Sequence, residues 1–222
     1  MKFSEVLFES TREIWSDYLK HPFIVEIANG NLDKIKFEKY LVQDYLYLKE
    51  YSRVFAMGMV KAETMEEIKF FYSSVKATME DENEYHVKYL RDLGYKLTEL
   101  EKMKEEGENS NYTAYMKSIS LTGGVEEIAV AILPCTWSYS YIGRYIMDNY
   151  KGKLEDNPFR GWIEMYADNG FAEFTDRWIN YIDDLCSDIS DSKKKKLIEI
   201  FIECSKHEMN FWDMSYNFKG DN

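Results

Sequence analysis

The chain has 222 residues, a formal net charge of −12 and 16% aromatic residues, with only three prolines and 11 glycines. The negative charge argues against binding to nucleic acid or to an anionic membrane, because both depend on clustered Lys and Arg. No apolar stretch reaches the roughly 18 residues of a membrane-spanning helix, and three cysteines without a CxxC pair do not indicate a disulfide framework. We expect one domain over residues 1–222, without a signal peptide, in the reducing cytoplasm.

Apolar residues recur at helical spacing along the whole chain, and no segment shows sustained strand alternation. The sequence therefore predicts an all-α fold. The predicted helices cover, in chain order, about 4–19, 22–29, 33–62, 64–93, 98–106, 112–122, 125–150, 158–169, 171–186 and a last helix from 192 onward.

Local signals place several of these boundaries. Asn29-Gly30 predicts a left-handed C-cap, and Thr64 with Glu67 forms a capping box that opens the fourth helix. Asn157-Pro158 has the pattern of an N-cap followed by a first-turn proline. A polar loop is expected to lead into a helix that begins near Tyr112.

Asp44 lies on the inward face of the helix predicted over 33–62, with Tyr40, Tyr47 and Tyr51 around it. An unpaired buried carboxylate is costly, so this side chain needs partners. Two roles are open. Tyrosine hydroxyls could hold the carboxylate as a link between helices, or it could accept hydrogen bonds from the edge of a bound amino-heterocycle.

Two Glu–His pairs at helical spacing, Glu82–His86 and Glu203–His207, raise the possibility of a di-iron site in a bundle. The second pair weakens it, because Glu203 lies about 140° around the helix from Glu208 at 100° per residue and should face solvent. Glu82 and His86, on one inward stripe with Met79, are expected to share a buried hydrogen bond. His21 before a proline is a weak candidate for a haem ligand.

Cys135 directly follows Pro134 in the apolar helix predicted over 125–150. An interior proline removes a backbone hydrogen bond and kinks a helix, which can open the thiol to a cavity. Tyr139 is one turn further along the same face. The alternative is that Cys135 is an ordinary small buried side chain, as we expect for Cys186 and Cys204.

Glu208 sits one turn from both Cys204 and Trp212 on the apolar face of the last helix. Desolvation raises the pKa of a carboxyl group in such surroundings, which suits it to act as general acid and general base in turn. The structural alternative is a hydrogen bond between helices.

Four segments carry a resemblance to a known family: HPFIVEIANGNL from His21, FEKYLVQDYLYL around Asp44, LPCTWSYSYIG around Cys135 and HEMNFWDM around Glu208. The chain resembles the TenA/thiaminase II family along nearly its whole length. That resemblance implies the haem-oxygenase-like helical bundle, a homotetramer and no metal or cofactor. It also implies hydrolysis of 4-amino-5-aminomethyl-2-methylpyrimidine to its hydroxymethyl counterpart in thiamin salvage, with cleavage of thiamin as a second activity.

The resemblance also implies a role for particular residues. Cys135 would be the nucleophile, Glu208 the acid/base and Asp44 the group that holds the pyrimidine. The pocket would be lined by Tyr47, Tyr112, Tyr139 and Tyr166. Two other functions stay open, namely a non-enzymatic binder of a thiamin-related pyrimidine with a regulatory role, and a haem or di-iron oxidase on the same fold.

Overall fold

The computed structural model describes residues 2–218, except for the side chains of 81–83. Within that part of the chain the structure is helical and contains no β-strand, which confirms the predicted all-α class. The helices are α1 Phe3–Tyr18, α2 Pro22–Asn29, α3 Lys34–Lys61, α4 Met65–Ala77, α5 Asn83–Asp92, α6 Leu97–Leu100, α7 Gly107–Thr122, α8 Val125–Asn149, α9 Arg160–Ala167, α10 Asn169–Leu185 and α11 Asp191–Tyr216. A π-helical turn, η1 Thr78–Glu82, joins α4 to α5, and a 3₁₀ turn, η2 Lys151–Lys153, follows α8.

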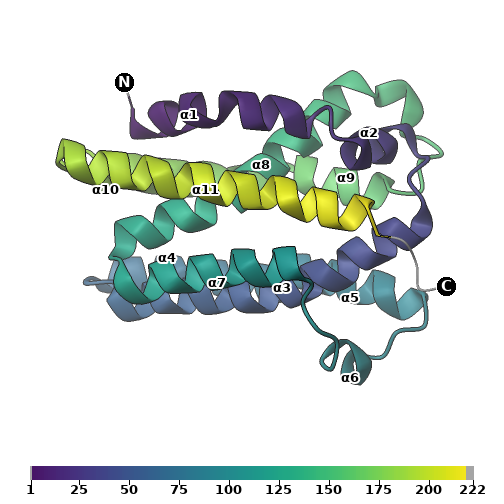
Figure 1. Ribbon diagram of the computed structural model, residues 1–222, viewed down its shortest axis with the longest axis horizontal. Coiled ribbons are helices and arrows are strands. Elements are labelled where there is room, and N and C mark those ends of the chain that lie inside the picture. The colour runs from purple at the N-terminus through teal and green to yellow at the C-terminus, as the bar shows by residue number, and fades with distance from the viewer. Residues whose placement is uncertain (1, 219–222) are drawn as a thin grey trace.

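Helix α11 lies at the centre of the packing. It contacts α8, α1, α7 and α3, and in Figure 1 it crosses the view between α1 on one side and α3 and α7 on the other. Helix α3 in turn packs against α4, α5, α7 and α8. The three helices that carry the reactive residues of the sequence, α3, α8 and α11, therefore contact one another pairwise.

Several predicted boundaries are confirmed. The Thr64 hydroxyl accepts from the Glu67 backbone N–H at 3.2 Å, and the Glu67 carboxylate accepts from the Thr64 N–H at 3.0 Å. Gly30 ends α2 at φ 76°, a left-handed conformation that glycine adopts without a steric penalty. Helix α8 runs unbroken through Pro134. Near this proline, the Tyr51 hydroxyl of α3 donates a 2.7 Å hydrogen bond to the Ile132 carbonyl.

Two predicted boundaries are wrong. Helix α6 spans only Leu97–Leu100, and α7 begins at Gly107, which places Tyr112 inside a helix and not at its start. Tertiary contacts explain the early start. The buried Asn109 side chain donates to the Gln43 carbonyl oxygen at 2.8 Å, and the Glu106 N–H donates to the Gln43 side chain at 2.9 Å.

The predicted stripe along residues 64–93 is also wrong in its middle. Met79 is 58% exposed, whereas Thr78 is buried. A π turn contains one more residue than an α turn, so the helix after η1 is rotated relative to the helix before it. The helical period used for the prediction does not contain that insertion.

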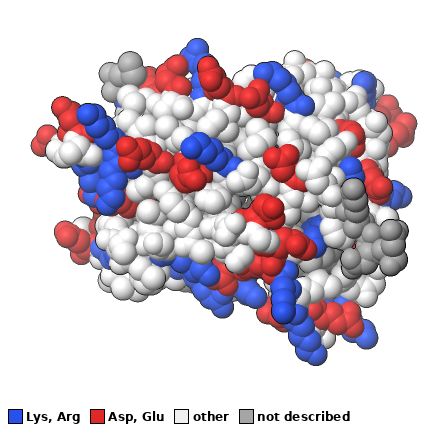
Figure 2. All heavy atoms as spheres, viewed as in Figure 1, with Lys and Arg blue, Asp and Glu red and all other residues white. Residues whose placement is uncertain are grey.

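Acidic and basic side chains are interspersed over the face shown in Figure 2. Within residues 2–218 every helix is too short or too polar to cross a bilayer.

Candidate active site

The three reactive side chains of the sequence are all buried, each on a different central helix. Asp44 on α3 exposes 3% of its surface, Cys135 on α8 exposes 7% and Glu208 on α11 exposes 2%. None of them lies on the outer surface, which is the arrangement that a shared internal site requires.

The phenol of Tyr139 interacts electrostatically with all three groups. Burial raises the pKa of Tyr139 well above its usual value, and the phenol of Tyr40 raises it further. Asp44, Glu208 and Cys135 then act in the same direction, since each can carry negative charge near the hydroxyl. Because such interactions weaken with distance, the two carboxyl groups and the thiol lie in the same region of the core as Tyr139.

Asp44 belongs to a hydrogen-bonded aromatic network. Tyr40, one turn earlier on α3, lies with its hydroxyl 3.1 Å from Asp44 Oδ2 and 3.3 Å from the Tyr139 hydroxyl. The indole N–H of Trp162, from α9, donates to the Tyr40 hydroxyl at 3.2 Å. The carboxylate is therefore contacted by Tyr40 of its own helix, and Trp162 of α9 orients that tyrosine.

Glu208 is held by Tyr112 of α7, whose hydroxyl donates to Oε1 at 2.8 Å. Burial raises the pKa of Tyr112 well above its usual value, and the Glu208 carboxylate raises it further, so the phenol remains a donor. The Tyr112 ring lies nearly parallel to the His207 ring, with centroids 5.1 Å apart. His207 thus packs against Tyr112, which in turn orients Glu208, the next residue in the sequence.

Tyr47 of α3 interacts electrostatically with Cys135. Burial raises the pKa of Tyr47 well above its usual value, and the Cys135 thiol raises it further. The Tyr47 ring stacks on Tyr51 at 5.3 Å and contacts Tyr112 at 5.2 Å between centroids. These rings form a contiguous aromatic group that joins α3 to α7.

Tyr166 of α9 completes the group of aromatic side chains. Its ring contacts Tyr139 at 4.6 Å and Phe171 at 5.1 Å. Phe171 also lines a surface hollow of about 450 Å³ between α9, α10 and the π turn. Phe171 therefore contacts both the buried aromatic group, through Tyr166, and this hollow.

The structure places all seven residues that the sequence singled out in one region of the core. Some of them contact each other directly, and the others are linked by electrostatic interactions or by a shared neighbour. They are Asp44, Tyr47, Tyr112, Cys135, Tyr139, Tyr166 and Glu208. Trp162 and His86 were not predicted as parts of it. Trp162 could have been noticed as an indole on an apolar helix, where its N–H needs a partner.

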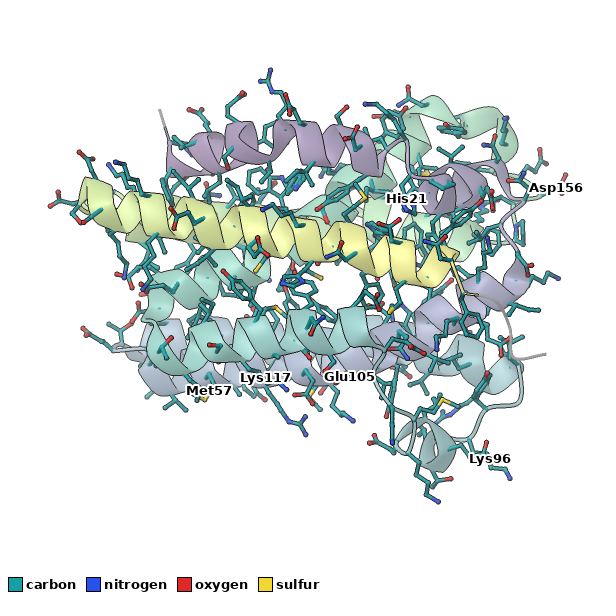
Figure 3. All side chains as sticks on the ribbon, viewed as in Figure 1. His21, Met57, Lys96, Glu105, Lys117 and Asp156 are labelled. Atoms are coloured by element: carbon teal, nitrogen blue, oxygen red, sulfur yellow. The ribbon has the colours of Figure 1, made fainter. Side chains whose placement is uncertain are left out.

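His21 and Glu203, two of the residues considered as haem or metal ligands, make other contacts. The His21 ring accepts from the Phe23 N–H at 3.1 Å and lies 3.2 Å from Asp213 of α11, at the turn between α1 and α2 in Figure 3. The Glu203 side chain is 45% exposed and pairs with Lys206, as its angle predicted. Within the described residues no group of three or more His, Cys, Asp and Glu could hold a metal ion, and the side chain of Glu82 lies outside that part.

Comparison with known proteins places this site in context. The sequence profile described as TENA/THI-4/PQQC family matches residues 9–218. The chain is 37% identical to the aminopyrimidine aminohydrolase of Halalkalibacterium halodurans over 220 residues, with 98% of this chain and 96% of that protein covered. It is 35% identical to the aminopyrimidine aminohydrolase of Helicobacter pylori, with 97% and 99% covered.

Solved structures agree with these relatives. A TenA homologue from P. horikoshii superposes with a TM-score of 0.88 at 31% identity, covering 97% of this chain and 99% of that chain. A domain with a heme oxygenase-like fold from Shewanella denitrificans superposes with a TM-score of 0.76 at 14% identity, covering 96% and 91%. The haem-oxygenase-like architecture expected from the sequence is confirmed.

Proposed function

Because the chain belongs to the TENA/THI-4/PQQC family, we propose that it is a thiamin-salvage hydrolase, an aminopyrimidine aminohydrolase. Its substrate is 4-amino-5-aminomethyl-2-methylpyrimidine, which it converts to the 5-hydroxymethyl compound with release of ammonia. Thiamin, which carries the same pyrimidine and methylene, is its second substrate. The observation that supports this most directly is the burial of Asp44, Cys135 and Glu208 on three mutually packed helices, with Tyr40 between Asp44 and Tyr139 and with Tyr112 on Glu208.

The chemistry requires a nucleophile, because water displaces an amine from the methylene only slowly. The Cys135 thiolate adds to the ring carbon next to the one that bears the methylene, while Glu208 gives a proton to the adjacent ring nitrogen. Addition makes the ring electron-rich. The lone pair of the ring amino group then expels the protonated amine and leaves an exocyclic methylene.

The second half of the reaction reverses these steps with water. Glu208, now a carboxylate, takes a proton from water as the oxygen attacks the methylene. The ring nitrogen then gives its proton to the ammonia released in the first half, and the ring regains aromaticity as the carbon–sulfur bond breaks and the Cys135 thiolate leaves. One water is consumed and one ammonia is released. Glu208 acts as the acid in the first half and as the base in the second.

Asp44 binds the substrate in this scheme. A carboxylate accepts hydrogen bonds, and the ring amino group of the substrate donates them. The interaction strengthens as that amino group becomes positively charged on expulsion of the leaving group. Tyr47, Tyr112, Tyr139 and Tyr166 then supply the aromatic walls of the pocket.

The proposal extends to the assembly and location of the protein. We expect a homotetramer in the cytoplasm, made of one domain per chain and without a metal or cofactor. Size-exclusion chromatography with light scattering measures the assembly, and metal analysis of the active protein tests the haem and di-iron alternative.

One experiment separates the enzyme from the regulatory binder. Purified protein is incubated with the aminomethyl pyrimidine and, separately, with thiamin, and product is followed by chromatography. Turnover of the aminomethyl pyrimidine with release of ammonia is expected, and faster than that of thiamin. Tight binding of either compound without any product would instead favour the binder.

A further inference from the structure

His86 is a buried histidine that the proposed reaction does not use. It lies on α5, exposes none of its surface and is flanked by the rings of Tyr40 and Tyr85 at centroid distances of 6.4 and 5.8 Å. Burial lowers the pKa of His86 to about 3, so its imidazole is neutral near pH 7. A neutral imidazole has one N–H, and the position of that proton decides what the ring can do.

One ring nitrogen of His86 points to the substrate-binding carboxylate. Its Nδ1 lies 3.3 Å from Asp44 Oδ2, the same oxygen that the Tyr40 hydroxyl approaches at 3.1 Å. This contact is an ion-pair distance and not a hydrogen bond, and among the described atoms neither nitrogen of His86 has a hydrogen-bond partner. A small rotation of the ring or of the carboxylate is enough to complete one, because the two atoms are already at contact distance.

The tautomer follows from the charge on the neighbour. A carboxylate only accepts hydrogen bonds, so Nδ1 must carry the proton for the contact to be favourable. The other tautomer would place the Nδ1 lone pair against Asp44 Oδ2, which is repulsive.

The neighbouring tyrosine explains why a second donor matters. The Tyr40 hydroxyl has one proton, and two acceptors lie within its reach, Asp44 Oδ2 and the Tyr139 hydroxyl. When that proton turns to Tyr139, an Nδ1–H of His86 still holds the carboxylate. An orientation that persists through the reaction keeps the acceptor in place for the ring amino group.

We propose that His86 is a positioning residue for Asp44: its Nδ1–H donates to Oδ2 and holds the carboxylate in the orientation that binds the aminopyrimidine ring. This inference rests on the proposed function for its kinetic consequence, but the contact itself is independent of any activity. The role is distinct from the Glu82–His86 hydrogen bond expected from the sequence, and the side chain of Glu82 lies outside the described residues.

The contact is tested first by nitrogen NMR on ¹⁵N-histidine-labelled protein. The chain has only three histidines, so the spectrum is simple, and an H86N sample assigns the signals of His86. The expected result is a neutral ring with a protonated Nδ1 and an unprotonated Nε2, and a shifted Nδ1–H proton in the Asp44→Asn variant. A ring protonated at Nε2 alone, or a proton unaffected by Asp44→Asn, would overturn the proposal.

The kinetic role is tested with three substitutions at the same buried position. The amide nitrogen of Asn occupies the place of Nδ1, that of Gln occupies the place of Nε2, and Leu has no donor. We expect KM for the aminomethyl pyrimidine to rise about tenfold in H86Q and H86L with kcat changed less than about threefold, and H86N to stay within about threefold on both. Equal KM values in properly folded H86N, H86Q and H86L would contradict the role.

The two proposals fail in different ways. If the wild-type protein turns over no pyrimidine, the proposed function fails, while the NMR experiment still decides whether His86 donates to Asp44. If the wild type is active and H86Q matches it in KM, only the positioning role fails. Circular dichroism and thermal unfolding of each variant show which of them fold.

Discussion

The Tyr112 hydroxyl donates a hydrogen bond of 2.8 Å to Glu208 Oε1, from α7 to α11. Both residues are almost fully buried, so water cannot easily replace this hydrogen bond when the phenol hydroxyl is removed. This contact joins Tyr112, which the family resemblance placed in the pocket, to Glu208, the proposed acid/base.

The contact leads to a graded prediction for two variants. Glu208→Gln removes the proton donor and acceptor, and kcat should fall by a factor of about 10² to 10⁴. Tyr112→Phe removes one hydrogen bond to the carboxylate and should lower kcat about tenfold. Glu203→Gln is the matched control, because Glu203 is on the same helix and 45% exposed. A Glu208→Gln enzyme as active as Glu203→Gln would remove Glu208 from the mechanism.

Gly143 on α8 lets α9 approach closely enough to place Tyr166. A Cβ at position 143 would lie 2.7 Å from the Tyr166 carbonyl carbon and 2.8 Å from the Ala167 nitrogen, which are backbone atoms and cannot rotate away. We expect Gly143→Ala to lower the free energy of unfolding by about 1–3 kcal/mol and to reduce activity by moving Tyr166.

Gly152→Ala is the control for this substitution, since a Cβ at position 152 meets no atom within 4 Å. Urea unfolding and turnover measured side by side on both variants give the comparison. Equal stability and activity in the two alanine variants would mean that the close approach of α8 and α9 is not needed.

Three residues of the candidate site could be predicted from the sequence because reactive side chains are rare on the apolar face of a helix. Asp44, Cys135 and Glu208 stand out on helical stripes that are otherwise apolar, and the helices that carry them begin and end close to the predicted positions. Their roles came from the resemblance to a family and not from periodicity.

What could not be predicted depends on contacts between distant segments. The start of α7 is set by Asn109 and Glu106 bonding to Gln43, some 60 residues earlier, and polar residues in a loop look the same without that partner. The π turn at Thr78 rotates His86 relative to a regular helix. Its position beside Asp44 could therefore not be read from a 3.6-residue repeat.

The burial of His86 also predicts a dependence of stability on pH. Its pKa in the folded state is about 3 and its usual value is 6.5, so the unfolded chain binds a proton that the folded chain excludes. The free energy of unfolding should therefore fall as the pH drops below 6.5, by up to about 1.4 kcal/mol per pH unit from this residue.

Histidine and asparagine at position 86 can be compared to isolate this effect. Between pH 7 and pH 5 the wild type should lose about 2 kcal/mol more than H86N, because asparagine does not titrate. Urea unfolding at several pH values measures the difference, and the other two histidines are common to both proteins. Parallel stability curves for the two proteins would show that His86 titrates normally.

We propose that Cys135 is the nucleophile of a hydrolase whose site is built by α3, α8 and α11. Turnover of two serine variants tests this role most directly. Cys135 and Cys186 are both buried, but Cys186 lines a surface hollow with residues of α1, α10 and α11. With the aminomethyl pyrimidine as substrate, Cys135→Ser should lower kcat by about a thousandfold or more while the protein stays folded, and Cys186→Ser should keep most of its activity. A folded Cys135→Ser protein that releases ammonia at the rate of Cys186→Ser would contradict the mechanism.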